Sequence, residues 1–351
     1  MHEVFLKKQK VKENKYPYII AEIGVNHEGS LEKALELVDL AASAGAHAAK
    51  FQTYKADTIA SVKSPAYWDL KKEDTKTQHE LFKKYDNFGE KEYILLHQHC
   101  LKKNIEFLST PFDVDCLAFL DPLLNFYKIA SADINNLPLL KEVAKKNKPV
   151  ILSTGASTID EIKFSLKFLK DNGCPDVSLL HCILNYPTEY DNANLLMIKD
   201  LKNIFPDNTI GYSDHTLPDE NMFTLIASYL FGALIIEKHF TDNKSLKGND
   251  HYHAMDSKDL QTFCQNIEKI NLLSGNNKKK VINTENLARV NARRSIVLKT
   301  NLKKGTILSS KEITTKRPGT GIEPIYWDNI IGKKLLKDLE KDHILNWEDI
   351  I

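Results

Sequence analysis

Eight short, largely apolar runs recur between residues 18 and 240, and each has the length of a β-strand. They lack the strict alternation of a half-exposed strand, which is the pattern of parallel strands covered on both faces. The runs span residues 18–24, 48–52, 105–110, 126–131, 149–154, 177–182, 209–214 and 233–240. Amphipathic segments separate them, so strand and helix alternate eight times. This alternation predicts a (β/α)8 barrel, with a doubly wound open sheet as the alternative.

Two of the expected helices have clear boundaries. Apolar positions recur at helical spacing over residues 31–44, where Ser30 is a suitable N-cap and Gly45 can close the C-terminal end. A second helix fits residues 158–170. The gap over residues 53–104 is longer than one helix requires, so we expect a loop insertion over the barrel mouth, followed by a helix near residues 90–102.

The pattern changes after residue 273. A polar stretch reads as a linker, and short strands with Gly and Pro turns follow, which predicts a small, mostly β module. We therefore expect an N-terminal extension over 1–16, a barrel over 17–273, a linker over 274–292 and the β module over 293–351.

Composition and charge exclude several classes of protein. A net charge of +1 over 351 residues gives no global field that would attract nucleic acid. The five cysteines are scattered and odd in number, so we expect neither a disulfide framework nor a structural zinc site. No run approaches the roughly 18 apolar residues of a membrane span. We expect a soluble, cytoplasmic protein without a nucleic-acid or membrane partner.

Polar or ionisable side chains end every expected strand, and barrel enzymes place their catalytic groups at these ends. Lysine supplies a point charge and Ser or Thr hydroxyls donate hydrogen bonds, so together they suit phosphate or carboxylate oxygens. A single hydroxyl at a strand end can equally bond to the backbone. The set that fits the anion-binding role is Lys50, Thr110, Lys128, Ser131, Ser153 and Ser213.

Two carboxylates are candidates for acid/base chemistry. Glu22 lies in an otherwise apolar strand, where a buried carboxylate needs a partner or a shifted pKa. The alternative for Glu22 is a salt bridge to a barrel lysine. Asp133, which follows the fourth strand, is the second candidate.

Two histidines, His215 and His239, end successive strands, so we expect them to meet above the barrel. Neutral imidazole is the commonest metal ligand. Two imidazoles leave other coordination positions of the metal open for substrate and water, which suits Mn²⁺ or Mg²⁺. The alternative is that both only hydrogen-bond in a polar mouth. His251 and His253 also have metal-like spacing, but a loop that contains Asp250 equally suits contacts with sugar hydroxyls.

A series of longer motifs then becomes informative. In chain order they are IIAEIGVNHEGS, KFQTY, STPFD, YKIAS, ILSTG, LLHC, NYPT, GYSDHT and EKHFT. This ordered set resembles the sialic acid synthase family, whose members make N-acetylneuraminate, legionaminate or related nonulosonates. The tail, with GKKLL after TTKRPGTGI, resembles the family's C-terminal antifreeze-like (SAF) domain. The resemblance implies a (β/α)8 barrel followed by a SAF domain, in a domain-swapped homodimer.

The resemblance also implies a reaction, in which phosphoenolpyruvate condenses with N-acetylmannosamine or a related 2-acetamido sugar and phosphate is released. It implies that the six anion-binding residues contact phosphoenolpyruvate, with Lys50 beside the reacting atoms. It implies metal ligation by His215 and His239, and acid/base chemistry by Glu22 and Asp133. The implied sugar contacts are Gln52, Tyr186, Asp250 and Arg317, of which Arg317 reaches the partner's site.

One departure from the family pattern concerns phosphate. Some members carry Thr-Asn before the Tyr-Pro-Thr motif, and their Asn helps hold phosphate. This chain has Leu184-Asn185, so Asn185 is the expected phosphoenolpyruvate contact, with its amide displaced by one residue. The sequence leaves the sugar open among N-acetylmannosamine, its 6-phosphate and a diacetamido-trideoxy hexose. Selectivity is expected from loop residues such as Tyr67, Trp68, Lys247 and Asn249.

The sequence is compatible with three rival functions. One is a barrel aldolase that forms a Schiff base on Lys50 or Lys128. Another is a sugar-binding protein without activity, and the third is a condensation with a sugar phosphate, as in octulosonate synthesis. The SAF-like tail argues against the aldolase, and the intact set of Glu22, Lys50 and the two histidines argues against an inactive protein.

Overall fold

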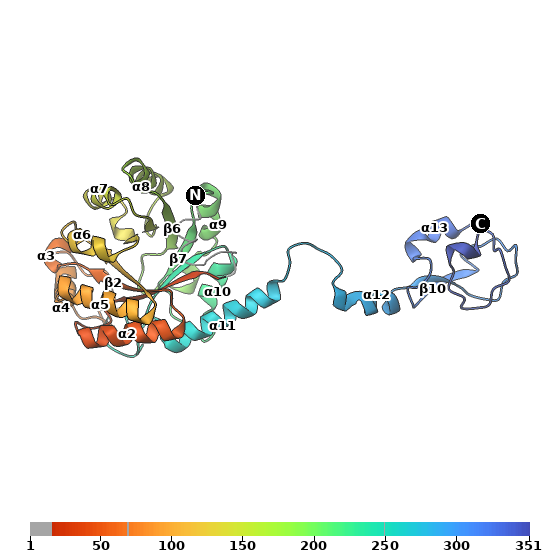
Figure 1. The fold of residues 1–351 in the computed structure, drawn as a ribbon, viewed down its shortest axis with the longest axis horizontal. Helices are drawn as coiled ribbons and strands as arrows, with labels where there is room; N and C mark the ends of the chain where they lie inside the picture. Colours follow the sequence, from red (N-terminus) through yellow and green to blue (C-terminus); the bar gives the residue numbers. More distant parts are fainter. Residues whose placement is uncertain (1–15, 69, 249) are drawn as a thin grey trace. The chain divides into compact units, whose positions relative to one another are not determined.

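The computed structural model describes residues 16–68, 70–248 and 250–351 (Figure 1). The chain divides between Ser274 and Gly275 into two compact units, each with its own hydrophobic core. The predicted extension, apart from Tyr16, and the predicted selectivity residue Asn249 lie outside the described residues.

The first unit is built on eight parallel strands. They are β1 (Tyr18–Gly24), β2 (Ala48–Thr53), β3 (Glu106–Pro111), β4 (Tyr127–Ile129), β5 (Val150–Ser153), β6 (Val177–Cys182), β7 (Ile210–Asp214) and β8 (Ile235–His239). Hydrogen-bonded pairs follow the order β3-β2-β1-β8-β7-β6-β5-β4. The two ends of this order, β3 and β4, also pack against each other, so the sheet closes on itself. The predicted (β/α)8 barrel is confirmed, and closure rules out the open doubly wound sheet.

Helices surround the strands (Figure 1). The α-helices of this unit are α2 (Leu31–Ala44), α3 (Ala56–Ile59), α4 (Gln78–Tyr85), α5 (Glu90–Lys103), α6 (Leu117–Leu120), α7 (Leu137–Lys145), α8 (Ile159–Asp171), α9 (Met197–Ile204), α10 (Phe223–Leu230) and α11 (Ser257–Ser274). Three 3-10 turns join them: η1 (Asp121–Leu123), η2 (Ser131–Asp133) and η3 (Tyr190–Asn192). The part of the chain that the structure describes contains no helix with the length and hydropathy needed to cross a membrane.

The predicted boundaries of α2 are confirmed in detail. The Ser30 side chain accepts a hydrogen bond from the backbone N–H of Lys33, which satisfies one of the free donors of the first turn. Gly45 closes the helix at a φ of 104°, in the left-handed region that favours glycine. The long gap after β2 holds α3 and α4 before α5, so the predicted insertion and the helix after it are also confirmed.

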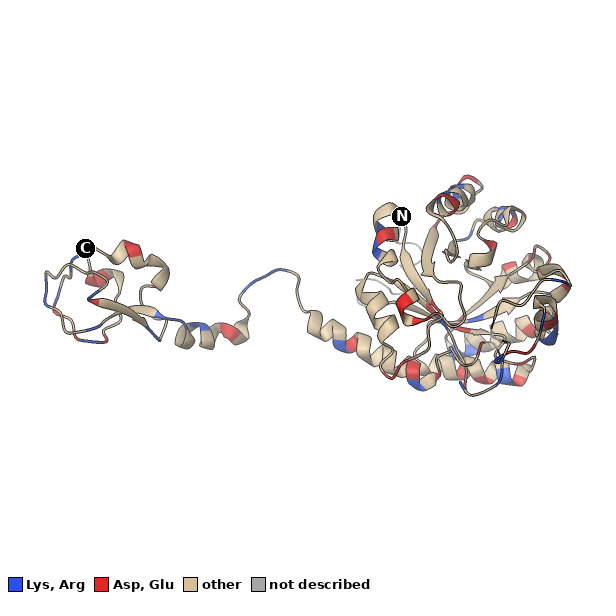
Figure 2. Cartoon of the chain, turned by 180° about the vertical axis from the view of Figure 1, so that it is seen from behind, with Lys and Arg blue, Asp and Glu red and all other residues tan. Residues whose placement is uncertain are grey.

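Charged residues of the barrel unit lie mainly on the outer helices and the loops (Figure 2). The strands are apolar, with Tyr18, Ile19 and Ile20 of β1 fully buried. Charged side chains that do lie on strands therefore stand out, and apart from Glu106 at the start of β3 they lie toward the mouth that the C-terminal ends form. Strand register puts Glu22 level with Lys50 of β2 on one side and with His239 of β8 on the other.

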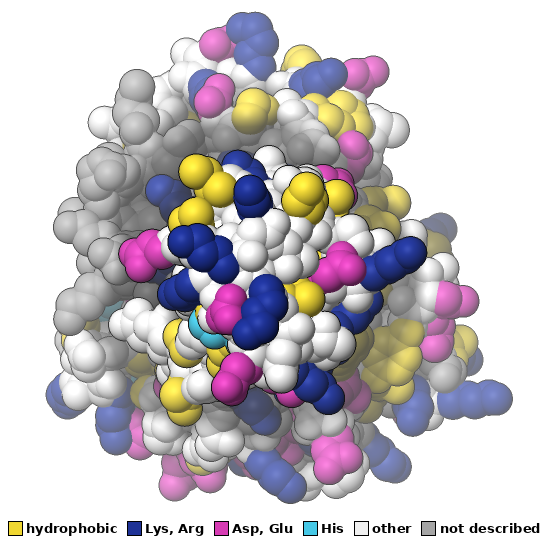
Figure 3. Space-filling model, turned by 90° about the vertical axis from the view of Figure 1, so that its right-hand side faces the viewer, with side chains coloured by type: hydrophobic (Ala, Val, Ile, Leu, Met, Phe, Trp, Pro, Cys, Tyr) yellow, Lys and Arg dark blue, Asp and Glu magenta, His cyan; other side chains and the backbone are white. Residues whose placement is uncertain are grey.

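The second unit is small and mostly irregular. Its regular elements are η4 (Asn283–Glu285), α12 (Asn286–Ala292), β9 (Ser295–Leu298), β10 (Ile313–Lys316), η5 (Pro324–Tyr326), α13 (Trp327–Ile330) and η6 (Trp347–Asp349). β9 and β10 pair antiparallel over a core that includes Ile296, Leu298 and Ile313. A helix occupies the end of the predicted linker, because polar composition alone does not exclude a short helical turn. Charges of both signs are interspersed on the face that Figure 3 shows.

Candidate active site

A cavity of about 310 Å³ opens at the C-terminal end of the barrel. Residues from all eight strands line it, together with side chains of the insertion after β2, including Tyr54, Tyr67 and Trp68. The insertion therefore lies over the barrel mouth, as expected. A concave, mostly enclosed site with a few convergent polar groups is the usual form of a small-molecule site.

Glu22 and Lys50 form the buried centre of this cavity. The Lys50 Nζ lies 2.6 Å from Glu22 Oε2 and donates a 3.1 Å hydrogen bond to Thr110 Oγ1. Gln52 Nε2 donates to the other carboxylate oxygen of Glu22 at 2.9 Å. Gly24 follows at a φ of +56°, and a Cβ there would come within 3.1 Å of both Gln52 and Glu22. Glycine at this position thus leaves room for the carboxylate and its amide partner.

Electrostatics distinguish the two groups. Burial raises the pKa of the Glu22 carboxyl, and attraction to Lys50 opposes this rise only in part. For Lys50, burial alone would lower the pKa, but the carboxylates of Glu22 and Glu237 outweigh it and raise the pKa. Lys50 therefore stays protonated. Glu22 has a raised proton affinity, which suits a group that accepts and donates protons. The salt bridge and the acid/base role, which the sequence left as alternatives for Glu22, are compatible.

Glu237 of β8 is a site residue that the sequence-based assignment missed. Its Oε1 lies 3.5 Å from Lys128 Nζ and 3.8 Å from Lys50 Nζ, and it accepts a 3.2 Å hydrogen bond from Ser213 Oγ. Burial would raise the pKa of Glu237, but the two lysines outweigh it and lower the pKa. The carboxylate thus occupies the centre of the predicted anion-binding set. The only sequence signal for Glu237 is a charged residue within an apolar strand. Its partners are remote in sequence.

The remaining anion-binding candidates also come together. Thr110, Ser131 and Ser153 line the cavity. The backbone N–H of Gly155 donates to Ser131 Oγ at 2.9 Å, which holds this hydroxyl at the wall of the cavity. Ser153 Oγ is buried and has no hydrogen-bond partner among the described residues. These hydroxyls, with Lys50 and Lys128, make a polar pocket suited to an anion.

Two of the predicted contacts have different surroundings. Asp133 lines the cavity, accepts a 2.9 Å hydrogen bond from Asn136 Nδ2, and has a pKa that burial raises. Asn185 is exposed, while its neighbour Leu184 lines the cavity instead. The structure therefore does not bring Asn185 to the anion-binding set. An amide displaced by one residue along an extended backbone points to the other side of the chain.

The two strand-end histidines meet, as expected, and a third joins them. Ring centroids of His215 and His239 lie 5.5 Å apart, and that of His253 lies 4.7 Å from His239. His239 Nδ1 is 3.4 Å from Asp250 Oδ2. His239, Asp250 and His253 each have one potential ligand atom, and these three atoms lie within 4.8 Å of one another. Of the two histidines with metal-like spacing, His253 lies beside His239, because the loop after β8 folds back over the mouth.

Tyr186 packs against this histidine group. Its ring centroid is 4.1 Å from that of His215 and 6.2 Å from that of His239. His215 Nδ1 lies 2.8 Å from the carbonyl oxygen of Ile183. A carbonyl can only accept, so Nδ1 carries the hydrogen, and the ring in its neutral form keeps a lone pair on Nε2. Burial alone would lower the pKa of His215, but the adjacent Cys182 and the Ile183 carbonyl outweigh it and raise the pKa. Burial, followed by the nearby His253 and His215, holds the pKa of His239 well below its usual value. Neutral imidazoles of this kind can bind a metal ion.

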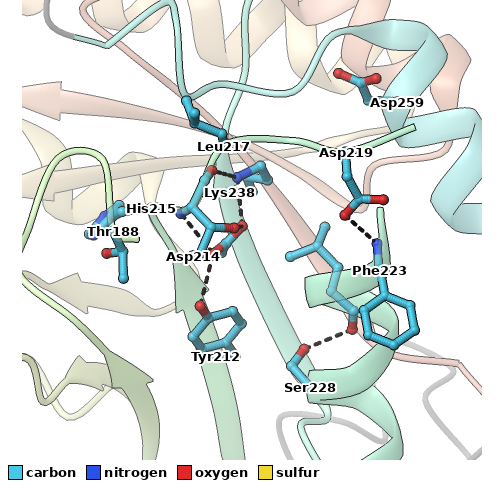
Figure 4. A network of polar contacts seen from close by, with 12 residues as sticks. Thr188, Tyr212, Asp214, His215, Leu217, Asp219, Phe223, Ser228, Lys238 and Asp259 are labelled. Atoms are coloured by element: carbon cyan, nitrogen blue, oxygen red, sulfur yellow. Dashed lines mark hydrogen bonds and ion pairs between the residues drawn. The ribbon is translucent and has the colours of Figure 1, made fainter. Parts of the chain in front are cut away.

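A buried ion pair supports the end of β7 (Figure 4). Lys238 Nζ lies 2.5 Å from Asp214 Oδ2 and donates to the Thr216 carbonyl at 2.8 Å. Tyr212 and the backbone N–H of Thr216 donate to the other Asp214 oxygen, at 2.8 and 2.9 Å. Both charged side chains are 1% exposed. The pair fixes the turn that carries His215, and its members alternate with the cavity-facing residues of the same strands.

Arg317 of the second unit is exposed. Its predicted role at a partner's site, and the predicted homodimer, stay predictions.

Comparison with known proteins finds relatives along almost the whole chain. A model of the NeuB family matches residues 37–279, and a model of the SAF domain matches residues 293–351. An uncharacterised protein of Methanocaldococcus jannaschii is 42% identical, over 95% of this chain and 94% of its own length. The N,N'-diacetyllegionaminic acid synthase of Campylobacter jejuni is 39% identical, over 93% of this chain and 98% of its own. The N-acetylneuraminic acid synthetase of Leptospira borgpetersenii superposes with a TM-score of 0.68 at 36% identity, over 78% of this chain and 90% of that chain.

Proposed function

This chain belongs to the NeuB family, and on that premise we propose that it condenses phosphoenolpyruvate with N-acetylmannosamine or a related 2-acetamido sugar, forming a nonulosonate and releasing phosphate. The observation that carries the proposal is the buried cluster of Glu22, Lys50, Lys128 and Glu237 at the mouth of the barrel. A barrel without catalysis has no need to bury four charges around one cavity, because each is costly to remove from water.

Phosphoenolpyruvate carries a phosphate and a carboxylate, so it requires several convergent donors. Lys50 and Lys128 supply positive charge, and the hydroxyls of Thr110, Ser131 and Ser153 supply hydrogen bonds. Because these groups are held by a closed barrel, they need little rearrangement when charge develops during the reaction. Preorganised donors of this type stabilise a charged transition state and the departing phosphate.

The histidine group fits a divalent metal ion, Mn²⁺ or Mg²⁺. His239 Nδ1 is buried without a hydrogen bond to the described residues, and His215 keeps its Nε2 lone pair. His215 and His239 would hold the metal, with Asp250 beside them. When bound, the metal supplies Lewis-acid polarisation of a sugar aldehyde oxygen.

Glu22 is assigned the proton transfers of the reaction. The C3 carbon of phosphoenolpyruvate forms the new bond to the aldehyde carbon, whose oxygen takes up a proton to become a hydroxyl. Water adds at C2 and loses a proton, and the C2–O bond to phosphate breaks as the new C2 hydroxyl loses its proton and becomes the ketone. Glu22 accepts the proton of the attacking water. Tyr54, Tyr67 and Trp68 of the insertion cover the cavity and limit access of bulk water.

The first experiment is phosphate release from phosphoenolpyruvate with Mn²⁺. The sugar panel is N-acetylmannosamine, its 6-phosphate, a 2,4-diacetamido-trideoxy hexose and arabinose 5-phosphate. We expect release with one 2-acetamido sugar, and loss of release when the metal is chelated. Release only with arabinose 5-phosphate would identify an octulosonate-type synthase. Release with none of the four sugars would remove the proposed reaction.

A second prediction concerns Glu237, whose carboxylate occupies the place where a bound phosphate would meet both lysines. We expect Glu237→Gln to bind inorganic phosphate roughly tenfold or more tightly, since removing one repulsive charge at close range exceeds about 1.4 kcal/mol. Isothermal titration of the full-length protein with phosphate measures this. Weaker binding in the variant would instead assign Glu237 to holding Lys50 and Lys128 in position. Glu161→Gln, an exposed helix-cap change, serves as the control.

A further inference from the structure

The loop after β8 brings a third imidazole to the candidate metal site. His253 is fully buried, and its ring centroid lies 4.7 Å from that of His239, 6.1 Å from that of His215 and 5.6 Å from that of Tyr186. Burying an imidazole of this size among two other imidazoles contributes little as apolar packing. A shared ligand accounts for this arrangement better, because each ring offers a nitrogen lone pair.

We propose that His253 and Asp250 complete the metal site with His239, and that this group makes the protein select a first-row transition ion over Mg²⁺. The inference rests on the proposed function only in that both use a metal at the barrel mouth. The ligand atoms of the three residues already lie within 4.8 Å of one another. Ligands at about 2.1 Å from a tetrahedral metal lie about 3.4 Å apart, so the three side chains must turn inward to close the site.

The donor chemistry determines the selectivity. Mg²⁺ prefers oxygen ligands and keeps most of its water, whereas imidazole nitrogen favours later first-row ions. His239 and His253 with the Asp250 carboxylate also leave positions open for His215, water and substrate, unlike a closed structural zinc site. Each additional imidazole therefore increases the preference for ions such as Mn²⁺, Co²⁺ or Zn²⁺ over Mg²⁺.

The backbone holds this loop against the end of β8. Met255 N–H donates to the His239 carbonyl at 2.8 Å, and Thr241 N–H donates to the Met255 carbonyl at 3.0 Å. Asn26 Nδ2 bridges the carbonyls of Phe240 and Asp250, at 3.0 and 3.3 Å. His253 is thereby placed before any ligand arrives, which lowers the entropic cost of metal binding.

His251 offers a matched control within the same loop. It is also buried and two residues away, but its Nδ1 lies 2.8 Å from Thr241 Oγ1, and it is not in the group of potential ligand atoms among the described residues. A loss of loop structure should affect both histidines, whereas a loss of ligation should affect only His253.

The test is metal binding to the full-length, metal-stripped protein without substrates. We expect His253→Ala to weaken Co²⁺ and Mn²⁺ affinity by about 10-fold to 100-fold in calorimetry, to change the visible spectrum of bound Co²⁺, and to leave Mg²⁺ affinity within about twofold. His251→Ala should keep the wild-type Co²⁺ spectrum and affinity. If His253→Ala unfolds, His253→Gln fills the same volume and takes its place.

Unchanged Co²⁺ affinity and spectrum in a folded His253 variant would overturn the proposal. An equal loss in the His251 and His253 variants would also overturn it, because the effect would then come from the loop. Since no substrate is present, the measured metal affinities do not depend on whether the proposed condensation occurs. If the wild-type protein catalyses the condensation and the His253 variant keeps its metal affinity, the role of His253 is rejected and the proposed function stands.

Discussion

Glu22→Gln is expected to lower kcat by about 10²–10⁴-fold, the usual contribution of a positioned acid or base. The amide keeps the shape of the side chain and an oxygen that can accept the hydrogen bond from Gln52. Lys50 keeps a second carboxylate, Glu237, at 3.8 Å. Substrate binding should therefore change little, with KM for phosphoenolpyruvate within a few fold of wild type. Steady-state phosphate release at saturating sugar gives both constants.

The pH dependence separates a catalytic role of Glu22 from a structural one. Burial raises the pKa of Glu22, so its carboxylate form is lost as the pH falls through that raised pKa. If the carboxylate acts as the base, wild-type kcat should fall as the pH drops below the pKa of Glu22. This fall should be absent from the pH profile of Glu22→Gln. Glu36→Gln, on the exposed face of α2, should leave the whole profile unchanged. Near-normal turnover in Glu22→Gln would exclude Glu22 as the acid/base group.

Lys238→Met is expected to lower the free energy of unfolding by about 3–5 kcal/mol, because it leaves a buried charge without its partner. The Asp214 carboxylate is 1% exposed and has Lys238 as its cation at 2.5 Å. Its neutral donors, Tyr212 and Thr216, do not balance the charge. Equilibrium urea unfolding followed by circular dichroism measures the loss.

Two companion variants define what the loss means. Lys167→Met breaks an exposed pair with Asp171 on α8 and should cost less than about 1 kcal/mol. Adding Asp214→Asn to Lys238→Met should recover part of the stability, because the unpaired charge is removed. A cost for Lys238→Met no larger than that for Lys167→Met would mean that water reaches Asp214 and that the buried pair does not stabilise the barrel.

The eight strands, their order and the polar character of their ends follow from the sequence. Hydrophobic runs and caps are local signals, as the agreement at Ser30 and Gly45 illustrates. Once eight parallel strands close into a barrel, their C-terminal ends must share one mouth. For this reason the meeting of Lys50, Lys128 and Ser213 could be predicted without coordinates.

Other features were decided only by the tertiary structure. Glu237 is one charge in an apolar strand, and its role depends on two lysines that closure places beside it. His253 lies in a loop whose path no periodicity encodes, and backbone pairing with β8 turns it toward His239. Asn185 differs from a cavity residue by a single position. Hydrophobic periodicity determines which face of a regular element is buried, but the direction of a loop side chain depends on contacts with residues far away in sequence.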